Sequence, residues 1–297
     1  MNQLSTHPTI VVGVDGSTPS KLALDWAVDE ASRRHLRLHL VSASGIDYAS
    51  DTLGAVVPVI EDECQRVLRD AAKHVAKIAP TVEVSTEAWR GQAAAALVAV
   101  SAQADTVVVG SRGRGSVGAA LAGSTSLQVA AHASCPVVVV RTLSTASPTR
   151  PRVVVGVDGS RVSSEAIGYA FAQASQREVG LTVVHAWDVE FVEGVIAVAS
   201  TSDLWERLGE EERALTAESV AGWAEKYPDV DVRTHVVRGH PVDVLVSESE
   251  GAELVVVGSR GRGGFSGLFM GSVSHGVLHR AQSPVAVVRP HPAGEAR

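Results

Sequence analysis

The chain reads Val11-Val12-Gly13-Val14-Asp15-Gly16-Ser17 near its start, and the same run recurs 143 residues later as Val154-Val155-Gly156-Val157-Asp158-Gly159-Ser160. A second run, Val107 to Gly115, recurs 148 residues later as Val255 to Gly263. Identical blocks at nearly the same offset indicate an internal duplication. A chain of 297 residues is also long enough for two ordinary domains. We predict two copies of one domain, at 1–142 and 152–297, joined by a Ser-, Thr- and Pro-rich linker at 143–151.

Apolar, β-branched runs alternate with helical patterns in both copies. In the first copy the predicted strands are Thr9–Val14, Leu36–Val41, Val82–Trp89, Thr106–Val109 and Pro136–Arg141. The first helix follows the N-cap Ser17 and is expected to bury Leu22, Trp26, Ala27 and Ala31. The later helices are predicted at Glu61–Ile78, Gln92–Ala102 and Ser124–Ala133. The strands of the second copy are predicted at Val153–Val157, Leu181–His185, Val230–Val237, Leu254–Val257 and Val285–Val288.

This alternation predicts parallel strands joined by right-handed crossovers. The predicted fold class is α/β, with two tandem flavodoxin-like domains, each a doubly wound five-stranded parallel sheet. The fifth strands, around Val137–Val140 and Val285–Val288, are short and apolar, and such edges are unsuited to water. We therefore predict that the copies pair through their fifth strands, and the same logic predicts a homodimer of whole chains.

Composition excludes several classes of protein. Hydrophobic residues make up 45% and charged residues 20%, which suits a chain with a full core. The net charge of −7 argues against a dedicated nucleic-acid binder. No stretch approaches the roughly 20 apolar residues that span a bilayer, so no membrane insertion is expected. Two cysteines, Cys64 and Cys135, cannot build a disulfide framework, and this favours the reducing cytoplasm.

A glycine-rich loop follows the fourth strand of each copy. The first reads Gly110-x-x-Gly113, nine residues, Gly123-Ser124, and the second reads Gly258-x-x-Gly261, nine residues, Gly271-Ser272. Glycines let the backbone approach an anion, and the helix that starts after the second glycine adds unpaired amides and a positive dipole end. The loop arginines, which can pair with phosphate oxygens, are Arg112, Arg114, Arg260 and Arg262. A purely structural turn with solvated arginines is the alternative, but the repeated spacing favours a phosphate site.

Asp15 and Asp158 end the first strand of each copy, on the edge that carries the glycine loops. A carboxylate there can accept hydrogen bonds from ribose hydroxyls or an adenine amino group. The alternative is an Asp-Gly turn that leads into the next helix. The two interpretations are compatible, because a turn can hold the carboxylate in place.

The pattern G-2x-G-9x-G-[S/T], with Val-Gly-Val-Asp-Gly-Ser at the start, resembles the universal stress protein family in its tandem two-domain form. The resemblance covers about Thr9–Arg141 and Arg152–Arg289, and the stretches Val184–Trp187 and Gly222–Pro228 resemble members found in mycobacteria and other actinobacteria. Members with the complete glycine motif bind ATP, so the resemblance implies ATP, with Mg²⁺ carried on its phosphates. In the first site it implies Gly13, Asp15, Gly110, Ser111, Arg112, Gly113, Arg114, Gly115, Ser116, Gly123, Ser124 and Thr125. In the second site it implies Gly156, Asp158, Gly258, Ser259, Arg260, Gly261, Arg262, Gly263, Gly264, Gly271, Ser272, Val273 and Ser274.

The first copy departs from this pattern at its adenine end, where Ser42 and Ser44 stand in place of His185 and Trp187 of the second copy. Other nucleotide chemistries fit less well. The frame Gly113-x-Gly115-x-x-Gly118 follows the fourth strand instead of the first, which argues against a Rossmann dinucleotide site, and no Gly-Lys-[Ser/Thr] sequence exists for a P-loop. His275 and His279 lack the glutamate of a His-Glu-x-x-His zinc site, and Cys135 is interpreted as a small core residue.

Two functions remain open. Efficient ATP hydrolysis needs a positioned water, a metal ligand and transition-state cations. The loops offer cations and amides, and the sequence shows no obvious carboxylate for metal or water beside them. We therefore expect an ATP-binding regulator of stress or growth control with slow or no hydrolysis, acting on a protein partner that the sequence does not identify. The alternative is a genuine ATPase or nucleotide-dependent phosphotransferase.

Overall fold

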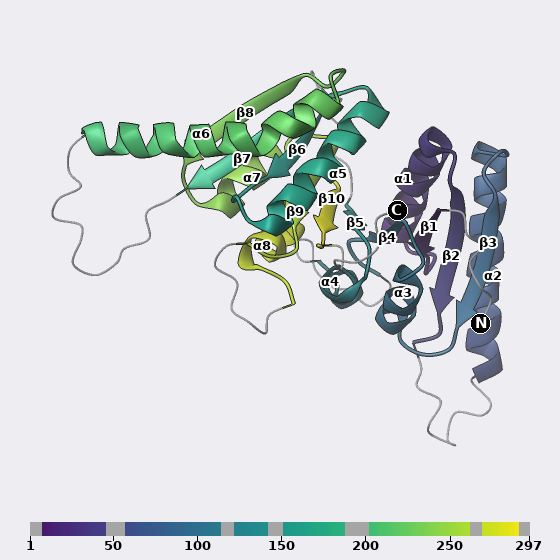
Figure 1. Cartoon of the computed structure of the whole chain (residues 1–297). Coiled ribbons are helices and arrows are strands. Elements are labelled where there is room, and N and C mark those ends of the chain that lie inside the picture. The colour runs from purple at the N-terminus through teal and green to yellow at the C-terminus, as the bar shows by residue number, and fades with distance from the viewer. Residues whose placement is uncertain are drawn as a thin grey trace.

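Strands and helices alternate along both copies (Figure 1) in a computed structural model that describes residues 8–45, 57–113, 122–141, 151–187, 202–261 and 269–290. The first copy contains β1 (Thr9–Gly13), α1 (Thr18–Arg34), β2 (Arg37–Ala43), α2 (Val57–Ile78), β3 (Val84–Trp89), α3 (Ala93–Ser101), β4 (Thr106–Gly110), α4 (Ser124–His132) and β5 (Val137–Val140). The second contains β6 (Arg152–Gly156), α5 (Arg161–Arg177), β7 (Gly180–Trp187), α6 (Ser202–Lys226), β8 (Val232–Arg238), α7 (Pro241–Glu248), β9 (Leu254–Gly258), α8 (Ser272–Arg280) and β10 (Val285–Val288). The bounds differ from the predicted ones by a few residues.

All these strands form one ten-stranded sheet in the order β3-β2-β1-β4-β5-β10-β9-β6-β7-β8. Neighbouring strands within each copy are parallel, which confirms the α/β class and the doubly wound sheet. β5 and β10 pair antiparallel, with Val139 opposite Val285 and Val137 opposite Val287. The predicted pairing through the fifth strands is therefore confirmed.

The strand order within each copy differs from that of flavodoxin in one respect. In flavodoxin the third strand lies beside the first, whereas here β4 lies beside β1 and β3 lies at the outer edge of the sheet. The composition of β3 explains this, because Ser85, Thr86 and Glu87 give it a half-exposed, polar pattern that suits an edge. The switch point consequently lies between β1 and β4.

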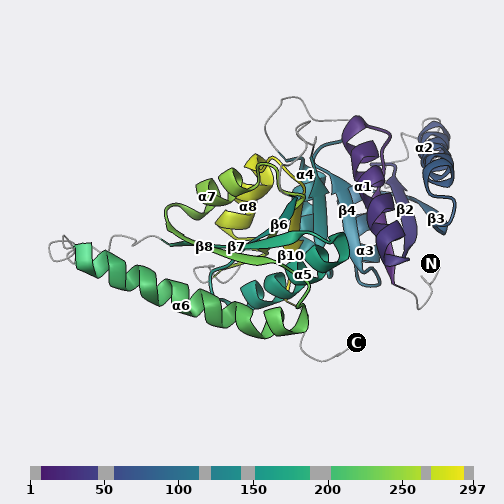
Figure 2. The same cartoon turned by 90° about the horizontal axis from the view of Figure 1, so that it is seen from above.

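Helices cover both faces of the sheet, as the view from above shows for α5 and α6 on one side of β6–β8 and α7 and α8 on the other (Figure 2). One buried core layer packs on α1, α2, α5 and α6, and includes Ile10 and Val12 of β1. The other packs on α3, α4, α7 and α8, and includes Val11 of the same strand. Each layer runs through both copies, so the two domains share a continuous core on either face.

The buried face of α1 is slightly rotated from the predicted one. Ala23, Leu24 and Val28 are buried together with the predicted Ala27 and Ala31. Leu22 and Trp26 are only partly buried, because they lie at the margin of the core layer. Trp26 also contacts the other copy, because its ring lies 5.1 Å from the guanidinium carbon of Arg177.

A buried polar cluster joins α1 to α5 across the boundary between the copies. Glu30 is 2% exposed and accepts hydrogen bonds from Arg177 at 2.6 Å and from Gln173 at 2.7 Å. Arg34 adds a weaker ion pair with Glu30 at 3.5 Å and a close one with Asp105 at 2.8 Å. The two copies are thus fixed by paired strands, a shared core and a buried ion pair.

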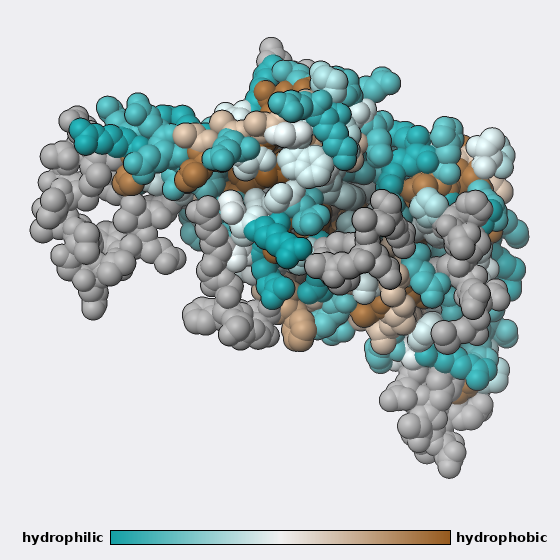
Figure 3. Space-filling view, in the orientation of Figure 1, coloured by the Kyte–Doolittle hydropathy of each residue, from teal (hydrophilic) through white to brown (hydrophobic). Residues whose placement is uncertain are grey.

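No helix in the described residues is long and apolar enough to cross a membrane. In the orientation of Figure 1, hydrophilic side chains cover most of the described surface, with small hydrophobic patches between them (Figure 3). Cys64 and Cys135 are both buried and unpaired.

Candidate nucleotide site

A cleft of about 760 Å³ opens at the carboxyl ends of β1 and β4, at the switch point of the first copy. Small-molecule sites in proteins typically have volumes of about 300–1,000 Å³. Its lining includes eight of the residues predicted for the first site. They are Gly13, Asp15, Gly110, Arg112, Gly113, Gly123, Ser124 and Thr125, with Ser126 adjoining them as a residue the prediction omitted. The structure therefore brings the first-strand aspartate and the glycine loop to one cavity.

Asp15 is held by a turn that the sequence predicted. Its Oδ1 accepts a hydrogen bond from the Ser17 amide at 2.9 Å and another from the Ser17 hydroxyl at 2.6 Å. Gly16 between them has φ +80°, a left-handed conformation that favours glycine. Asp158 repeats the arrangement, since its Oδ1 accepts from the Ser160 amide at 3.0 Å. The turn fixes one oxygen of each carboxylate and leaves the other directed toward the glycine loop.

The first-strand aspartate lies against the second glycine of each loop. A Cβ atom at Gly113 would come within 2.7 Å of Asp15 Oδ2, and a Cβ at Gly261 would collide in the same way with Asp158 Oδ2. The two motifs are far apart in sequence, yet each glycine makes room for the carboxylate. This contact repeats in both copies and ties the predicted nucleoside and phosphate ends into one site.

Other glycines of the motif are required by packing. A Cβ at Gly110 would approach the backbone of Pro19 to 2.7 Å, and one at Gly13 would approach Leu97 to 3.0 Å. Gly156 stands in the same relation to Leu245, at 2.8 Å. Packing alone therefore accounts for glycine at these positions, whereas at Gly113 and Gly261 the space of a side chain is taken by the first-strand aspartate.

The amino end of α4 faces the cleft without a side-chain cap. Gly123 is the N-cap residue of α4, and Gly271 is that of α8, and neither helix has a side-chain cap hydrogen bond. The Gly123 amide donates to the Ser111 carbonyl at 2.6 Å, which fixes the helix start on the end of β4. First-turn amides at such an end are available to an anion.

Two serines of the helix starts have a structural task. Ser274 is 2% exposed, and its hydroxyl donates to the carbonyls of Ser259 at 3.2 Å and Gly271 at 3.0 Å. Ser126 makes the same bonds in the first copy, to Ser111 and Gly123. Both tie the helix to the preceding loop.

The other predicted site residues differ in exposure. Ser111 and Ser259 are buried, whereas Arg260, Gly261 and Ser272 of the second site are exposed, and Val273 is half-buried. The predicted residues Arg114, Gly115, Ser116, Arg262, Gly263 and Gly264 lie outside the described residues.

The two sites differ at the end of the second strand. Ser42, Ser44 and Gly45 line the cleft of the first copy. In the second copy the corresponding His185 is 7% exposed, and its ring nitrogens lie 2.8 Å from the Val157 carbonyl and 2.8 Å from Glu212 Oε2. The difference noted in the sequence is therefore present at the same place in the fold, where the first copy has a small serine at the cleft and the second has a buried histidine.

Helix α2 supplies a wall that the sequence did not predict. Val59, Ile60, Glu63 and Cys64 line the cleft, and they come from a helix that begins at Val57 instead of the predicted Glu61. Glu63 is a carboxylate at the cleft, but Arg66 donates to both of its oxygens at 2.7 Å. Its position on α2 carried no local motif, so only the fold reveals it.

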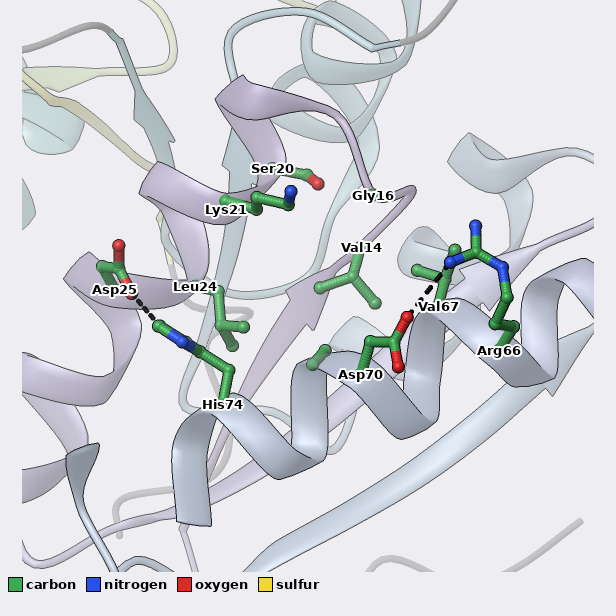
Figure 4. A pocket seen from close by; sticks show the side chains of 11 residues that line it. Val14, Gly16, Ser20, Lys21, Leu24, Asp25, Arg66, Val67, Asp70 and His74 are labelled. Carbon is green, nitrogen blue, oxygen red and sulfur yellow. Dashed lines mark hydrogen bonds and ion pairs between the residues drawn. The ribbon is translucent and has the colours of Figure 1, made fainter. Parts of the chain in front are cut away.

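A second cavity of about 420 Å³ lies between α1 and α2 and shares Val14, Ser20 and Val67 with the cleft (Figure 4). Two pairs of ionisable side chains lie around it. His74 lies 2.6 Å from Asp25, and Arg66 donates to Asp70 at 3.1 Å. None of the predicted site residues lines it, so the glycine-loop cleft is the better candidate for the nucleotide.

The residues considered for other chemistries have ordinary surroundings. Burial raises the pKa of the Cys135 thiol to about 12, which disfavours the thiolate needed of a nucleophile. Within the described residues there is no cluster of three or more His, Cys, Asp or Glu side chains suited to a metal ion. His275 and His279 face each other with Nε2 atoms 3.2 Å apart, and Nδ1 of His279 accepts from the Ala122 amide at 3.0 Å.

The sequence model of the universal stress protein family matches the chain twice, at residues 7–141 and 149–289. The chain belongs to this family. It is 40% identical to a universal stress protein of Mycolicibacterium smegmatis, over 98% of this chain and 100% of that protein. It is also 40% identical to one from Mycobacterium tuberculosis strain H37Rv, over 94% of this chain and 96% of that protein.

Solved structures of universal stress proteins share the fold. One from Archaeoglobus fulgidus covers 96% of this chain and 96% of its own length, with a TM-score of 0.67 and 18% identity. The tandem universal stress architecture predicted from the sequence is therefore shown both by relatives in mycobacteria and by the fold.

Proposed function

We propose that this universal stress protein is an ATP-binding regulator with one nucleotide site in each copy. The observation that carries the proposal is the repeated contact between the first-strand aspartate and the second loop glycine, at the mouth of a 760 Å³ cleft in the first copy. Asp15 and Asp158 would accept hydrogen bonds from the nucleoside, and the helix starts at Gly123 and Gly271 would bind phosphates. Mg²⁺ would arrive on the phosphates, because oxygens of the nucleotide itself suit that ion.

Binding without efficient turnover is the form of activity that the cleft supports best. The described carboxylates at the cleft are Asp15, whose Oδ1 is engaged by Ser17, and Glu63, which is engaged by Arg66. A rapid ATPase needs a metal ligand or a group that positions water, and both of these carboxylates already have partners. We therefore propose a nucleotide-dependent regulator, whose protein partner would recognise the bound state. The two buried, unpaired cysteines are compatible with the cytoplasm expected from the sequence.

The structure removes the reason for which a homodimer was expected from the sequence. The β5 and β10 edges that suggested it are already paired with each other inside one chain. The outer edges of the sheet are β3 and β8, which are half-exposed and polar. Dimerisation of whole chains stays a prediction that would need a different surface.

This proposal is tested by whether the protein retains bound nucleotide during purification. The protein is expected to release ATP or ADP on denaturation, identified by mass, from protein purified without added nucleotide. ATP turnover should lie far below the 1–100 s⁻¹ typical of kinases. Turnover within that range would favour the ATPase or phosphotransferase instead, whereas failure to retain or bind any adenine nucleotide would contradict the proposal.

A further inference from the structure

Two arginines that no motif singled out stand beside the glycine-loop arginines. Arg141 directly follows β5, and Arg289 directly follows β10. The Ser111 amide donates to the Val140 carbonyl at 2.8 Å, so the chain places Arg141 next to Arg112 across the β4–β5 pair. The second copy repeats the register, with the Ser259 amide donating to the Val288 carbonyl at 2.7 Å. Arg289 consequently lies next to Arg260.

Each of these arginines is anchored by the opposite copy. Arg141 donates through Nη1 to the Leu278 carbonyl of α8 at 2.6 Å. Arg289 donates through Nη1 to the Ala131 carbonyl of α4 in the first copy, and through Nη2 to the Phe269 carbonyl of its own copy. Leu278 and Ala131 belong to the last turns of their helices, where unpaired carbonyls and the dipole favour a cation. The anchor fixes the guanidinium while leaving further N–H donors of Arg141 available, because a guanidinium carries five.

Positive charges face one another at both places. Burial and the neighbouring Arg112 lower the pKa of Arg141, and burial and Arg260 lower the pKa of Arg289. Among the described residues, no carboxylate forms an ion pair with Arg141, Arg260 or Arg289. Arg112 lines the cleft, and Arg141, which bonds the Leu278 carbonyl of the other copy, is its neighbour in the next strand's continuation. Two neighbouring guanidinium groups are suited to a phosphate, because a guanidinium group binds phosphate through two oxygens.

We propose that Arg141 and Arg289 bind the outer phosphates of the nucleotide, Arg141 with Arg112 in the first site and Arg289 with Arg260 in the second. This inference rests on the proposed ATP sites. It adds that each site is completed by an arginine whose position depends on the opposite copy. The two domains would then have to remain paired for full affinity toward a triphosphate, while affinity for the nucleoside part would depend on one copy alone.

Single-site backgrounds allow a direct test. Gly261→Val should block the second site, because the added side chain collides with the carboxylate of Asp158, so that only the first site can bind ATP. Gly113→Val should block the first site by the same collision with Asp15, so that only the second site can bind ATP. In the Gly261→Val background, Arg141→Gln is expected to weaken ATP binding on the order of ten-fold and adenosine binding less than about two-fold, since only the triphosphate uses the charged contact. Arg289→Gln should produce the corresponding loss in the Gly113→Val background. Affinities would be measured by calorimetry at fixed salt.

A conservative variant and a matched control guard against a loss of folding. Arg141→Lys keeps the charge and should recover most of the lost ATP affinity. Arg280→Gln removes a similar charge from the same end of α8, where Arg280 pairs with Asp243 at 2.7 Å, and should leave ATP affinity unchanged. Equal losses for ATP and adenosine, or no loss in Arg141→Gln while the background still binds ATP, would overturn this inference alone. Absence of ATP binding by the wild-type protein would instead refute the proposed function.

Discussion

Asp15 and Asp158 each divide two tasks between two oxygens. Oδ1 holds the turn by accepting from Ser17 or Ser160, and Oδ2 lies toward the glycine loop. Under the proposed function, the same side chain would hold the turn and bind the nucleotide. A substitution that keeps the turn and removes the charge can separate these tasks.

Asp15→Asn and Asp158→Asn are expected to weaken ATP binding with little effect on the fold. Asparagine retains an oxygen that accepts from the Ser17 or Ser160 amide, so unfolding without nucleotide should shift little. Loss of charged hydrogen bonds to the nucleoside should cost on the order of 1–3 kcal/mol of binding free energy per site. Alanine at either position should lower both binding and stability, because the turn also loses its acceptor. Asparagine variants that bind ATP as tightly as wild type would contradict the role of the carboxylates.

The glycines of the motif should differ in what they tolerate. Gly113→Ala and Gly261→Ala are expected to reduce ATP binding, since the new Cβ displaces the aspartate. Gly222→Ala is a matched control in α6, where a Cβ would meet nothing within 4 Å. It should leave binding intact and stabilise the helix by up to about 1 kcal/mol. Binding isotherms and urea unfolding of the three variants check this, and unimpaired binding in both loop variants would be evidence against the contact.

Helix α8 reaches the start of α4 through a histidine. His279 Nδ1 accepts from the Ala122 amide, so this nitrogen must be unprotonated while the contact exists. Burial, with His275 and Arg141 as nearby basic groups, lowers the pKa of His279 below its usual value. The unfolded chain therefore binds more protons than the folded chain as pH falls below about 6.5. Stability should rise with pH through that window and fall on acidification.

His279→Gln should reduce this acid sensitivity. The glutamine oxygen can still accept from Ala122, but the side chain does not titrate. Urea unfolding at pH 5.5 and 7.5 should show a smaller difference in unfolding free energy for His279→Gln than for wild type. His240→Gln, at a side chain that is 66% exposed, serves as the control and should retain the wild-type difference. An unchanged pH dependence in His279→Gln would rule out this contact as a source of acid sensitivity.

At the level of elements, the sequence predicted the parts of the fold that repeat or alternate. Apolar runs located the strands, and the exposed fifth-strand edges predicted the pairing of β5 with β10. The same local reasoning could not place β3 at the edge of the sheet or extend α2 back to Val57. Strand order and the first turn of a helix depend on what packs against them, which no local period records.

The site residues divide in the same way, into those that a repeated motif predicts and those that only the tertiary structure reveals. Asp15 and Gly113 were found because a motif repeats in both copies, and the structure brings them together. Glu63, Arg141 and Arg289 carry no such signal, since their positions come from the tertiary arrangement. Arg141 and Arg289 in particular acquire their surroundings only where the two copies meet.

For the whole molecule, the ion pair between Glu30 and Arg177 should matter more than any surface pair. The two side chains are 2% and 4% exposed and lie 2.6 Å apart across the copy boundary. Arg177→Met should destabilise the chain by about 3 kcal/mol, because it leaves a buried carboxylate with weaker partners. Arg33→Met, which breaks the exposed pair with Asp29, should cost less than about 1 kcal/mol. Urea unfolding of both variants checks this, and equal costs would mean that the buried pair does not hold the copies together.

Two nucleotide sites in one chain are the central claim, and calorimetric titration with ATP tests it most directly. Wild-type protein should bind close to two ATP molecules per chain. Gly113→Val and Gly261→Val should each bind one, and the double variant none, because each substitution collides with the aspartate of its own copy. Unequal affinities are expected, since Ser42 lines the first site where His185 stands in the second. No binding of ATP by the wild type, or two sites persisting in the double variant, would contradict the account.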